Sequence, residues 1–147
     1  MAAIGSRGRL VAVDLSWGML KQCAARRAGL TPGPNLVQAN GSYLPFADES
    51  FDAVFHYGGV NLFSEPELAL REFARVVRRG GIVAWGDEGF APELPPGWRR
   101  RAAAWLNPGF ERPRLQAPAT VQVVAEHTVV GGFAYLTVAK KLAPDMG

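Results

Sequence analysis

Three polar side chains stand where short apolar runs of the sequence end, and they are the first candidates for chemistry. Asp14 closes the run "LVAVD", Asn40 follows "NLVQA", and His56 lies near the end of "FDAVFHY". Carboxylate and amide oxygens accept hydrogen bonds, and an imidazole, whose ordinary pKa is near neutrality, can take up a proton. An acid that closes a buried strand before a capped helix is typical of nucleotide-binding α/β proteins. Alternatively, Asp14 only organises the turn before the helix, and His56 only packs or caps.

The rest of the composition argues against several other kinds of site. The single cysteine, Cys23, and two histidines provide neither an intramolecular disulfide nor a metal-ligand set. The net charge of +3 includes one tight basic cluster, Arg99–Arg101, which we interpret as a solvated helix face; nucleic-acid binding stays a minor alternative. No apolar run reaches the roughly 18 residues of a membrane span, and the N-terminus has no signal-peptide pattern. We therefore expect a cytoplasmic protein without a membrane partner.

The elements that must position these side chains form an α/β pattern. Short apolar runs predict strands at Leu10–Asp14, 35–40, Phe51–His56 and in "IVAW". Ser16 is placed to cap a helix that Gly29 can stop. Its inner face is expected to hold Leu20, Cys23 and Ala24.

The second half of the sequence predicts one long helix, an insertion and a hairpin. In "SEPELALREFARVVRRGG", Ser64 and Glu67 are expected to form a capping box, and Gly80-Gly81 to end the helix. A proline-rich, loop-rich insertion at about 91–118 is expected to hold one short helix around Trp98–Leu106. Two β-rich runs then flank Gly131-Gly132, which predicts a two-residue hairpin turn. Asp87 and Glu88, after "IVAW", are expected to be solvated loop acids. We expect a single domain over residues 1–147.

From Arg9 to about Gly89 the sequence resembles class I S-adenosylmethionine-dependent methyltransferases of the ubiquinone/menaquinone-biosynthesis-like small-molecule group. "VAVDLSWGML" is similar to the second strand and following helix of that family, and "QANGSYLPFADESFDAVFHYGG" to its third-strand loop and fourth strand. "ALREFARVVRRGGIVAW" is similar to its next helix and fifth strand, and the closing hairpin to its sixth and seventh strands. The resemblance implies a Rossmann-like α/β fold, with a mainly parallel sheet that ends in an antiparallel hairpin.

The resemblance also implies a cofactor, S-adenosylmethionine, and a role for each candidate residue. The ligand of such folds lies across the carboxyl ends of the strands. Asp14 would accept both ribose hydroxyls, and Asn40, where the family usually has Asp, would accept the adenine amino group without charge assistance. Gly41 would donate its N–H to adenine N1, and the predicted apolar contacts to adenine are Leu15 and Leu44. His56, facing a small-molecule acceptor, is the candidate catalytic base.

Nothing in the sequence matches the first strand of the family or the glycine-rich loop after it. "MAAIGSRGR" is similar only to the end of the first helix, so we expect an N-terminally truncated chain. A sheet without that central strand has open edges. Either the flanking strands close the gap, or a second copy in a homodimer or a missing N-terminal segment completes the sheet. Two further functions stay open: a non-catalytic remnant that pairs through open strand edges, and a nicotinamide-dependent Rossmann oxidoreductase.

Overall fold

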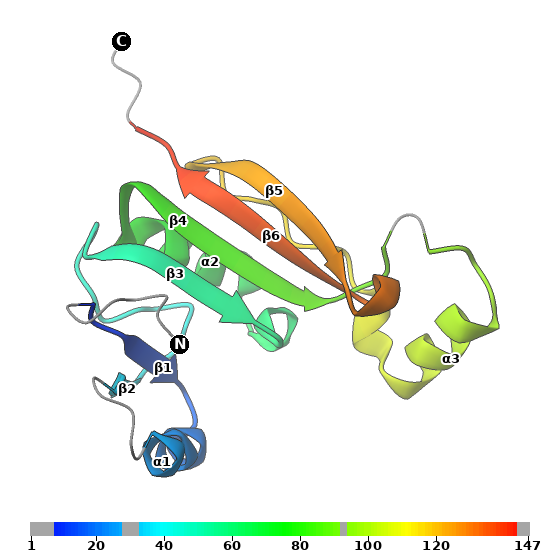
Figure 1. Ribbon diagram of the computed structural model, residues 1–147, viewed down its shortest axis with the longest axis horizontal. Coiled ribbons are helices and arrows are strands. Elements are labelled where there is room, and N and C mark those ends of the chain that lie inside the picture. Colours follow the sequence, from blue (N-terminus) through cyan, green and yellow to red (C-terminus); the bar gives the residue numbers. More distant parts are fainter. Residues whose placement is uncertain (1–7, 28–32, 92–93, 144–147) are drawn as a thin grey trace. The chain divides into compact units, whose positions relative to one another are not determined.

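The computed structural model of the protein describes residues 8–27, 33–91 and 94–143. The chain divides into two compact units, Met1–Pro45 and Phe46–Gly147, and each unit is described here by itself. Figure 1 shows the elements of both units along the chain. No helix in the described ranges is long and apolar enough to cross a bilayer.

The first unit consists of two short parallel strands and one helix. Strand β1 (Val11–Asp14) pairs in parallel with β2 (Asn35–Gln38) along their whole length, and helix α1 (Trp17–Arg26) connects them. The predicted cap of α1 is confirmed, because Ser16 Oγ accepts the Met19 N–H at 3.3 Å. Leu20 is buried, as expected of the inner face of the helix. The predicted stop at Gly29 lies outside the described residues.

The second unit is built on a four-stranded sheet in the order β3-β4-β6-β5. Strands β3 (Phe51–Tyr57) and β4 (Val77–Glu88) are parallel, whereas β6 (Ala134–Lys141) runs antiparallel to both β4 and β5 (Val121–Val129). The predicted α/β fold with a C-terminal antiparallel hairpin is confirmed. The described strands pair twice in parallel and twice antiparallel, so the sheet arrangement is mixed.

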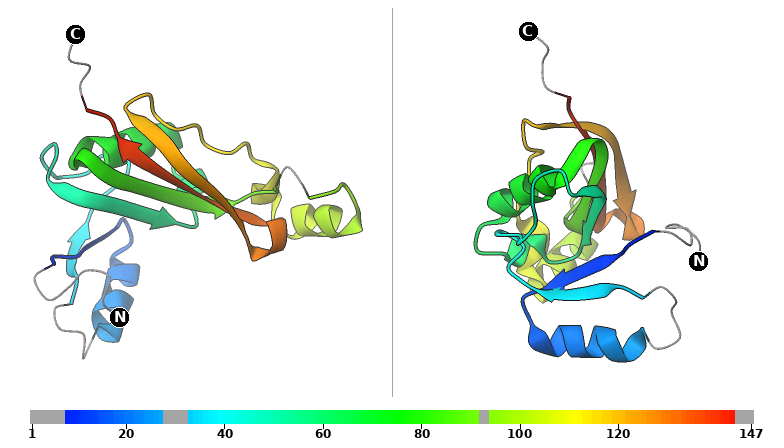
Figure 2. Two further views of the ribbon diagram at one scale, coloured as in Figure 1. Left: turned by 45° about the horizontal axis from the view of Figure 1, so that its top comes forward. Right: turned by 90° about the vertical axis from the view of Figure 1, so that its left-hand side faces the viewer.

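The core of the second unit lies on one face of this sheet. Helix α2 (Pro66–Val76) packs there, and Figure 2 shows it along β3 and β4. Side chains alternate along β4, so that every second one points to the helix side. The buried apolar side chains of this core include Leu70, Phe73, Val83, Trp85, Tyr135 and Ala139.

The ends of α2 differ from the sequence prediction. The N-cap is Glu65 without a side-chain cap, so the predicted capping box of Ser64 and Glu67 is wrong. Proline at position 66, which has no N–H to satisfy, starts the helix instead. The helix also ends earlier than Gly80-Gly81: Val77 is buried and already pairs with Phe51 as the first residue of β4. Pairing with β3 therefore overrides the helical pattern of the sequence.

The remaining connections contain three short 3₁₀ turns and one helix. They are η1 (Val60–Leu62), α3 (Trp98–Leu106), η2 (Pro108–Glu111) and η3 (Val130–Gly132), and α3 has the predicted bounds. The hairpin turn is longer than predicted, because Val129 pairs with Ala134 and leaves four residues in the loop. Three of these, Val130, Gly131 and Gly132, have positive φ angles. The turn therefore places a non-glycine residue, Val130, as well as the two glycines in the left-handed region.

Candidate functional site

The first unit brings the predicted nucleoside residues to one edge of its parallel strand pair. Asp14 is the last residue of β1, and its backbone carbonyl accepts the Ala39 N–H at 3.2 Å. Asn40 follows Ala39 directly, so it lies next to this hydrogen bond between the ends of β1 and β2. Because the strands are parallel, their carboxyl ends share this edge. The structure thus places Asp14, Leu15 and Asn40 in one neighbourhood.

Asp14 organises the turn before α1 and still has an available carboxylate oxygen. Oδ1 accepts the Ser16 N–H at 2.8 Å, which is the turn-forming alternative that the sequence left open. Oδ2 has no hydrogen-bond partner in the part of the chain that the structure describes. Asp14 is also the only acidic residue among the first 45 residues of the sequence. It is therefore the one side-chain anion of this unit that can accept hydrogen bonds from a ligand.

Asn40 begins a compact turn that contains the other predicted nucleoside contacts. Its Oδ1 accepts the Ser42 N–H at 3.0 Å and its carbonyl accepts the Tyr43 N–H at 2.9 Å. An amide oxygen has two lone pairs, so the Asn40 side chain can accept one more bond. Gly41 lies inside this turn and the half-buried Leu44 follows it. Tyr43, an exposed aromatic residue of the same turn, was missed by the sequence analysis.

Leu15 lies beside Asp14 as an exposed apolar side chain. It is 67% exposed, and its carbonyl accepts the Gln38 Nε2–H at 3.1 Å. That bond links the first residue after β1 to the last residue of β2. An exposed leucine at a strand edge can pack against a flat ring of a ligand. Such packing is favourable because it removes the apolar side chain from water.

His56 belongs to the second unit and is surrounded by aromatic side chains. Its ring centroid lies 5.4 Å from that of Phe63 and 5.8 Å from that of Phe73. Burial lowers the pKa of His56 below its ordinary value, an effect that the charge of Asp87 opposes. The ring is therefore neutral at pH 7. Its Nε2 is buried and has no hydrogen-bond partner among the described residues. Aromatic neighbours and burial are what is expected if His56 only packs in the structure, the alternative that the sequence analysis left open.

Asp87 holds the loop that follows β3, and the expectation that it is a solvated loop acid is wrong. It is only 3% exposed. Oδ1 accepts the N–H groups of Gly59 at 3.1 Å and Glu88 at 2.8 Å, and Oδ2 accepts that of Asn61 at 2.8 Å. This carboxylate thereby satisfies donors of the left-handed Gly59 and the η1 turn. The sequence gives no sign of this role, because it depends on the parallel pairing of β3 with β4.

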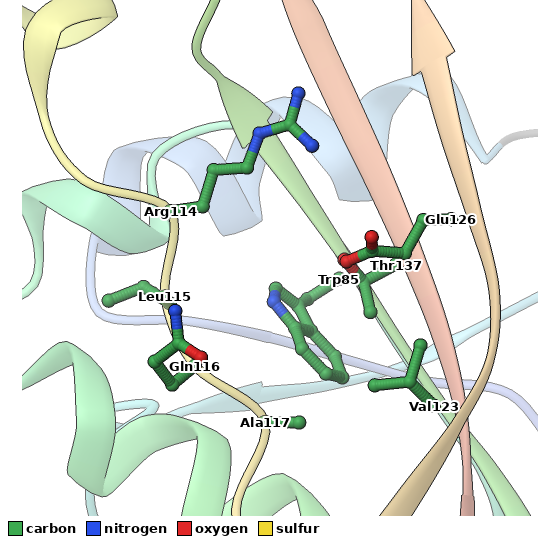
Figure 3. Close-up of a pocket in the computed structure, with 8 residues that line it drawn as sticks. All are labelled: Trp85, Arg114, Leu115, Gln116, Ala117, Val123, Glu126 and Thr137. Carbon is green, nitrogen blue, oxygen red and sulfur yellow. The ribbon is translucent and has the colours of Figure 1, made fainter. Parts of the chain in front are cut away.

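A hollow of about 340 Å³ lies elsewhere in the second unit, over the sheet face that carries Trp85. Figure 3 shows Trp85 between the segment that carries Arg114 and Gln116 and the strand residues Glu126 and Thr137. None of the predicted site residues lines it. In the described ranges there is also no group of three or more His, Cys, Asp or Glu side chains placed to hold a metal ion.

Comparison with known families gives a direct match. A family model described as a methyltransferase domain matches residues 1–85. A demethylmenaquinone methyltransferase of Thermobifida fusca is 40% identical over 88 residues, which are 59% of this chain and 37% of that protein. A ubiquinone/menaquinone biosynthesis C-methyltransferase of Xanthomonas oryzae is 39% identical over 80 residues, which are 53% of this chain and 32% of that protein. The chain thus spans about a third of the length of these curated relatives.

Solved structures share the fold at low sequence identity. A SAM-dependent methyltransferase from Aquifex aeolicus matches with a TM-score of 0.63 and 17% identity, over 94% of this chain and 71% of that chain. The [4+2]-cyclase SpnF matches with a TM-score of 0.67 and 14% identity, over 92% of this chain and 66% of that chain. At such identities the similarity establishes the Rossmann-like fold alone.

Proposed function

The chain belongs to the methyltransferase domain family, and on that premise we propose that it takes part in S-adenosylmethionine-dependent methyl transfer to a small-molecule acceptor. The observation that carries the proposal is the available Oδ2 of Asp14 beside Asn40, at the carboxyl edge of a parallel strand pair. S-adenosylmethionine, when bound, supplies a methyl group on a sulfonium, which is already a strong electrophile. The main task of the protein is then to bind and orient the cofactor and the acceptor and to exclude water, rather than to activate the methyl group.

The residues of the first unit fit the nucleoside half of that cofactor. Asp14 would accept the ribose hydroxyls, since a carboxylate oxygen with no partner among the described residues can form charge-assisted bonds. Asn40 would accept the adenine amino group through the second lone pair of Oδ1, and the Gly41 N–H would serve a ring nitrogen. Leu15 and Leu44 would cover the adenine faces. These five residues form our proposed nucleoside site.

His56 is the proposed base for the acceptor, and its surroundings support one part of that role. Burial lowers the pKa of His56, which favours the neutral imidazole that can take up a proton and also makes it a weaker base. The loop that Asp87 holds begins two residues further on, so the end of β3 is well fixed. The curated relatives are named for quinone methylation, and quinone precursors are therefore the first acceptors to assay.

We further propose that an added strand beside β1 strengthens cofactor binding. β1 pairs only with β2 among the described strands, so no described strand occupies its other edge. The family resemblance implies that such a strand, with its glycine-rich loop, holds the methionine part of the ligand. A preceding segment or a second copy could supply it. Gel filtration with and without S-adenosylhomocysteine tests the second source, because a ligand-dependent dimer is then expected.

The experiment that tests the proposed function is a calorimetric titration with S-adenosylhomocysteine of the full chain and of Asn40→Asp. The carboxylate of that variant keeps the bond from the Ser42 N–H and adds charge assistance to the adenine bond. A gain of about 1 kcal/mol, or roughly fivefold in affinity, is expected. Equal affinities would remove Asn40 from the site. Absence of binding to both proteins would overturn the proposed function.

A further inference from the structure

Helix α3 exposes large apolar side chains to an unusual degree. None of its nine residues is buried. Trp98 is 78% exposed, Trp105 83% and Leu106 75%. The chain has four tryptophans, all in the described ranges, and these two are the most exposed of them. Large apolar side chains gathered on a surface mark a place where a partner covers them.

The three side chains share one face of the helix. At 100° per residue, positions 98, 102, 105 and 106 fall within about one third of a turn of each other. Arg101 lies at one margin of that face. At the other margin the Arg99 guanidinium lies 6.0 Å from the centroid of the Phe133 ring of the second unit. The helix contains no acidic residue. The outer face of α3, defined here as Trp98, Ala102, Trp105 and Leu106, is thus an apolar stripe with the exposed cation Arg101 at its margin.

The opposite side of α3 fixes the helix to the second unit, so the outer face stays turned to solvent. The Arg100 guanidinium lies 4.5 Å from the centroid of the Phe90 ring, which stacks on Phe110 at 5.4 Å. Ala103 and Ala104, on the same side as Arg100, are half-buried. Figures 1 and 2 show α3 beyond the end of the four-stranded sheet, past the turn between β5 and β6.

We propose that the outer face of α3 docks on the surface of an anionic lipid bilayer. Tryptophan prefers the boundary between headgroups and acyl chains, where its apolar ring and polar N–H are both accommodated. Leu106 would enter the acyl boundary, and Arg101 would meet acidic headgroups. The helix lies on the surface rather than across it, because nine residues cover only about half of the hydrocarbon thickness.

Charge favours this partner over two others. In a symmetric contact between two copies, the Arg101 side chains of both copies would lie beside one apolar patch, and their like charges would repel. Nucleic-acid phosphates would pair with the arginines but would leave Leu106 in water. Of these three partners, only an anionic bilayer accommodates both the apolar stripe and Arg101. The sequence analysis expected no membrane partner. The sequence alone does not reveal this face, because its exposure depends on how Arg100 and the alanines anchor the helix.

The test uses the full chain and sedimentation with vesicles of phosphatidylcholine containing phosphatidylglycerol, against vesicles of phosphatidylcholine alone. Leu106→Ser is compared with Leu62→Ser, because Leu62 is equally exposed at 75% but lies in η1. Arg101→Gln is compared with Arg71→Gln, an exposed arginine on α2. In the variant Trp17→Phe, which lacks the third exposed tryptophan, quenching of fluorescence by brominated lipid reports whether Trp98 and Trp105 reach the acyl boundary. No cofactor is present, so the result is independent of the proposed function.

We expect binding to the anionic vesicles only, quenching by brominated lipid, and a loss of about fivefold in partitioning for Arg101→Gln. Leu106→Ser should weaken binding and Leu62→Ser should not. Equal losses for the two leucine variants, or no sedimentation with either vesicle, would overturn the proposal. So would a lipid-free dimer that Leu106→Ser dissociates, or retention on RNA without binding to vesicles.

Discussion

The Asp87 carboxylate offers the sharpest test of how the end of β3 is held. It accepts three backbone N–H groups, from Gly59, Asn61 and Glu88, at 2.8–3.1 Å while only 3% exposed. In Asp87→Asn the amide oxygen can keep the two bonds that Oδ1 accepts, but it loses their charge assistance. The new NH₂ group then faces the Asn61 N–H, and two donors cannot bond to each other.

The expected cost follows from these three bonds. Losing charge assistance costs about 1 kcal/mol for each retained bond, and an unsatisfied buried donor costs at least about 1 kcal/mol more. The free energy of unfolding should therefore fall by about 3 kcal/mol. With a urea m-value of about 2 kcal/mol/M, the midpoint falls by about 1.5 M.

Urea denaturation of the full chain is the assay, followed by tryptophan fluorescence, to which the buried Trp85 contributes. The control is Asp52→Asn: Asp52 is an 86% exposed side chain whose ion pair with Arg78 should contribute less than about 1 kcal/mol. Amide exchange should also accelerate at Gly59 and Asn61 before global unfolding. A midpoint for Asp87→Asn equal to that of Asp52→Asn would refute the reasoning.

Three further predictions concern the same region. Gly86→Ala should destabilise the fold by about 2 kcal/mol, because a Cβ there would lie 2.4 Å from the Tyr135 carbonyl oxygen. In the same denaturation assay Gly97→Ala, which has nothing within 4 Å but replaces the N-cap of α3, should cost less than about 1 kcal/mol. Burial lowers the pKa of His56 from 6.5, so the unfolded chain binds a proton at this residue more readily than the folded chain. The free energy of unfolding should therefore fall as the pH drops below about 6.5. In His56→Phe the free energy of unfolding should vary less between about pH 7.5 and about pH 5.5. Asp87→Asn should lower the pKa of His56 further, as measured by NMR titration, and an unchanged pKa would contradict the charge interaction.

Much of the fold could be predicted from local patterns. The cap at Ser16, the bounds of α3 and the antiparallel strands at the C-terminus all follow from short-range signals in the sequence. The failures occur where pairing between distant segments decides. Val77 continues the helical pattern of α2, yet pairing with Phe51 makes it a strand residue. The Gly131-Gly132 pattern predicts a tight turn, but the register of Val129 with Ala134 requires a longer one.

In the candidate site, too, local sequence signals could be predicted and contacts between distant segments could not. Asp14 and Asn40 could be placed at one edge in advance, because both follow strands that the sequence marks clearly, and parallel strands end together. Asp87 could not be recognised, since its three partners are backbone N–H groups of a loop that is brought near by β3–β4 pairing. The exposed stripe on α3 likewise depends on which side of the helix Arg100 anchors.

The most direct test of the central claim is the affinity of the full chain for S-adenosylhomocysteine, measured by calorimetry together with Asp14→Asn and Asp52→Asn. Asp14→Asn removes the only acid of the first unit without changing its shape, and the lost charge assistance of two ribose bonds should cost about 2 kcal/mol, or roughly 30-fold. The account predicts that the wild-type chain and Asp52→Asn bind alike and Asp14→Asn binds about 30-fold more weakly. Equal binding by all three proteins, or no binding by the wild-type chain, would contradict it.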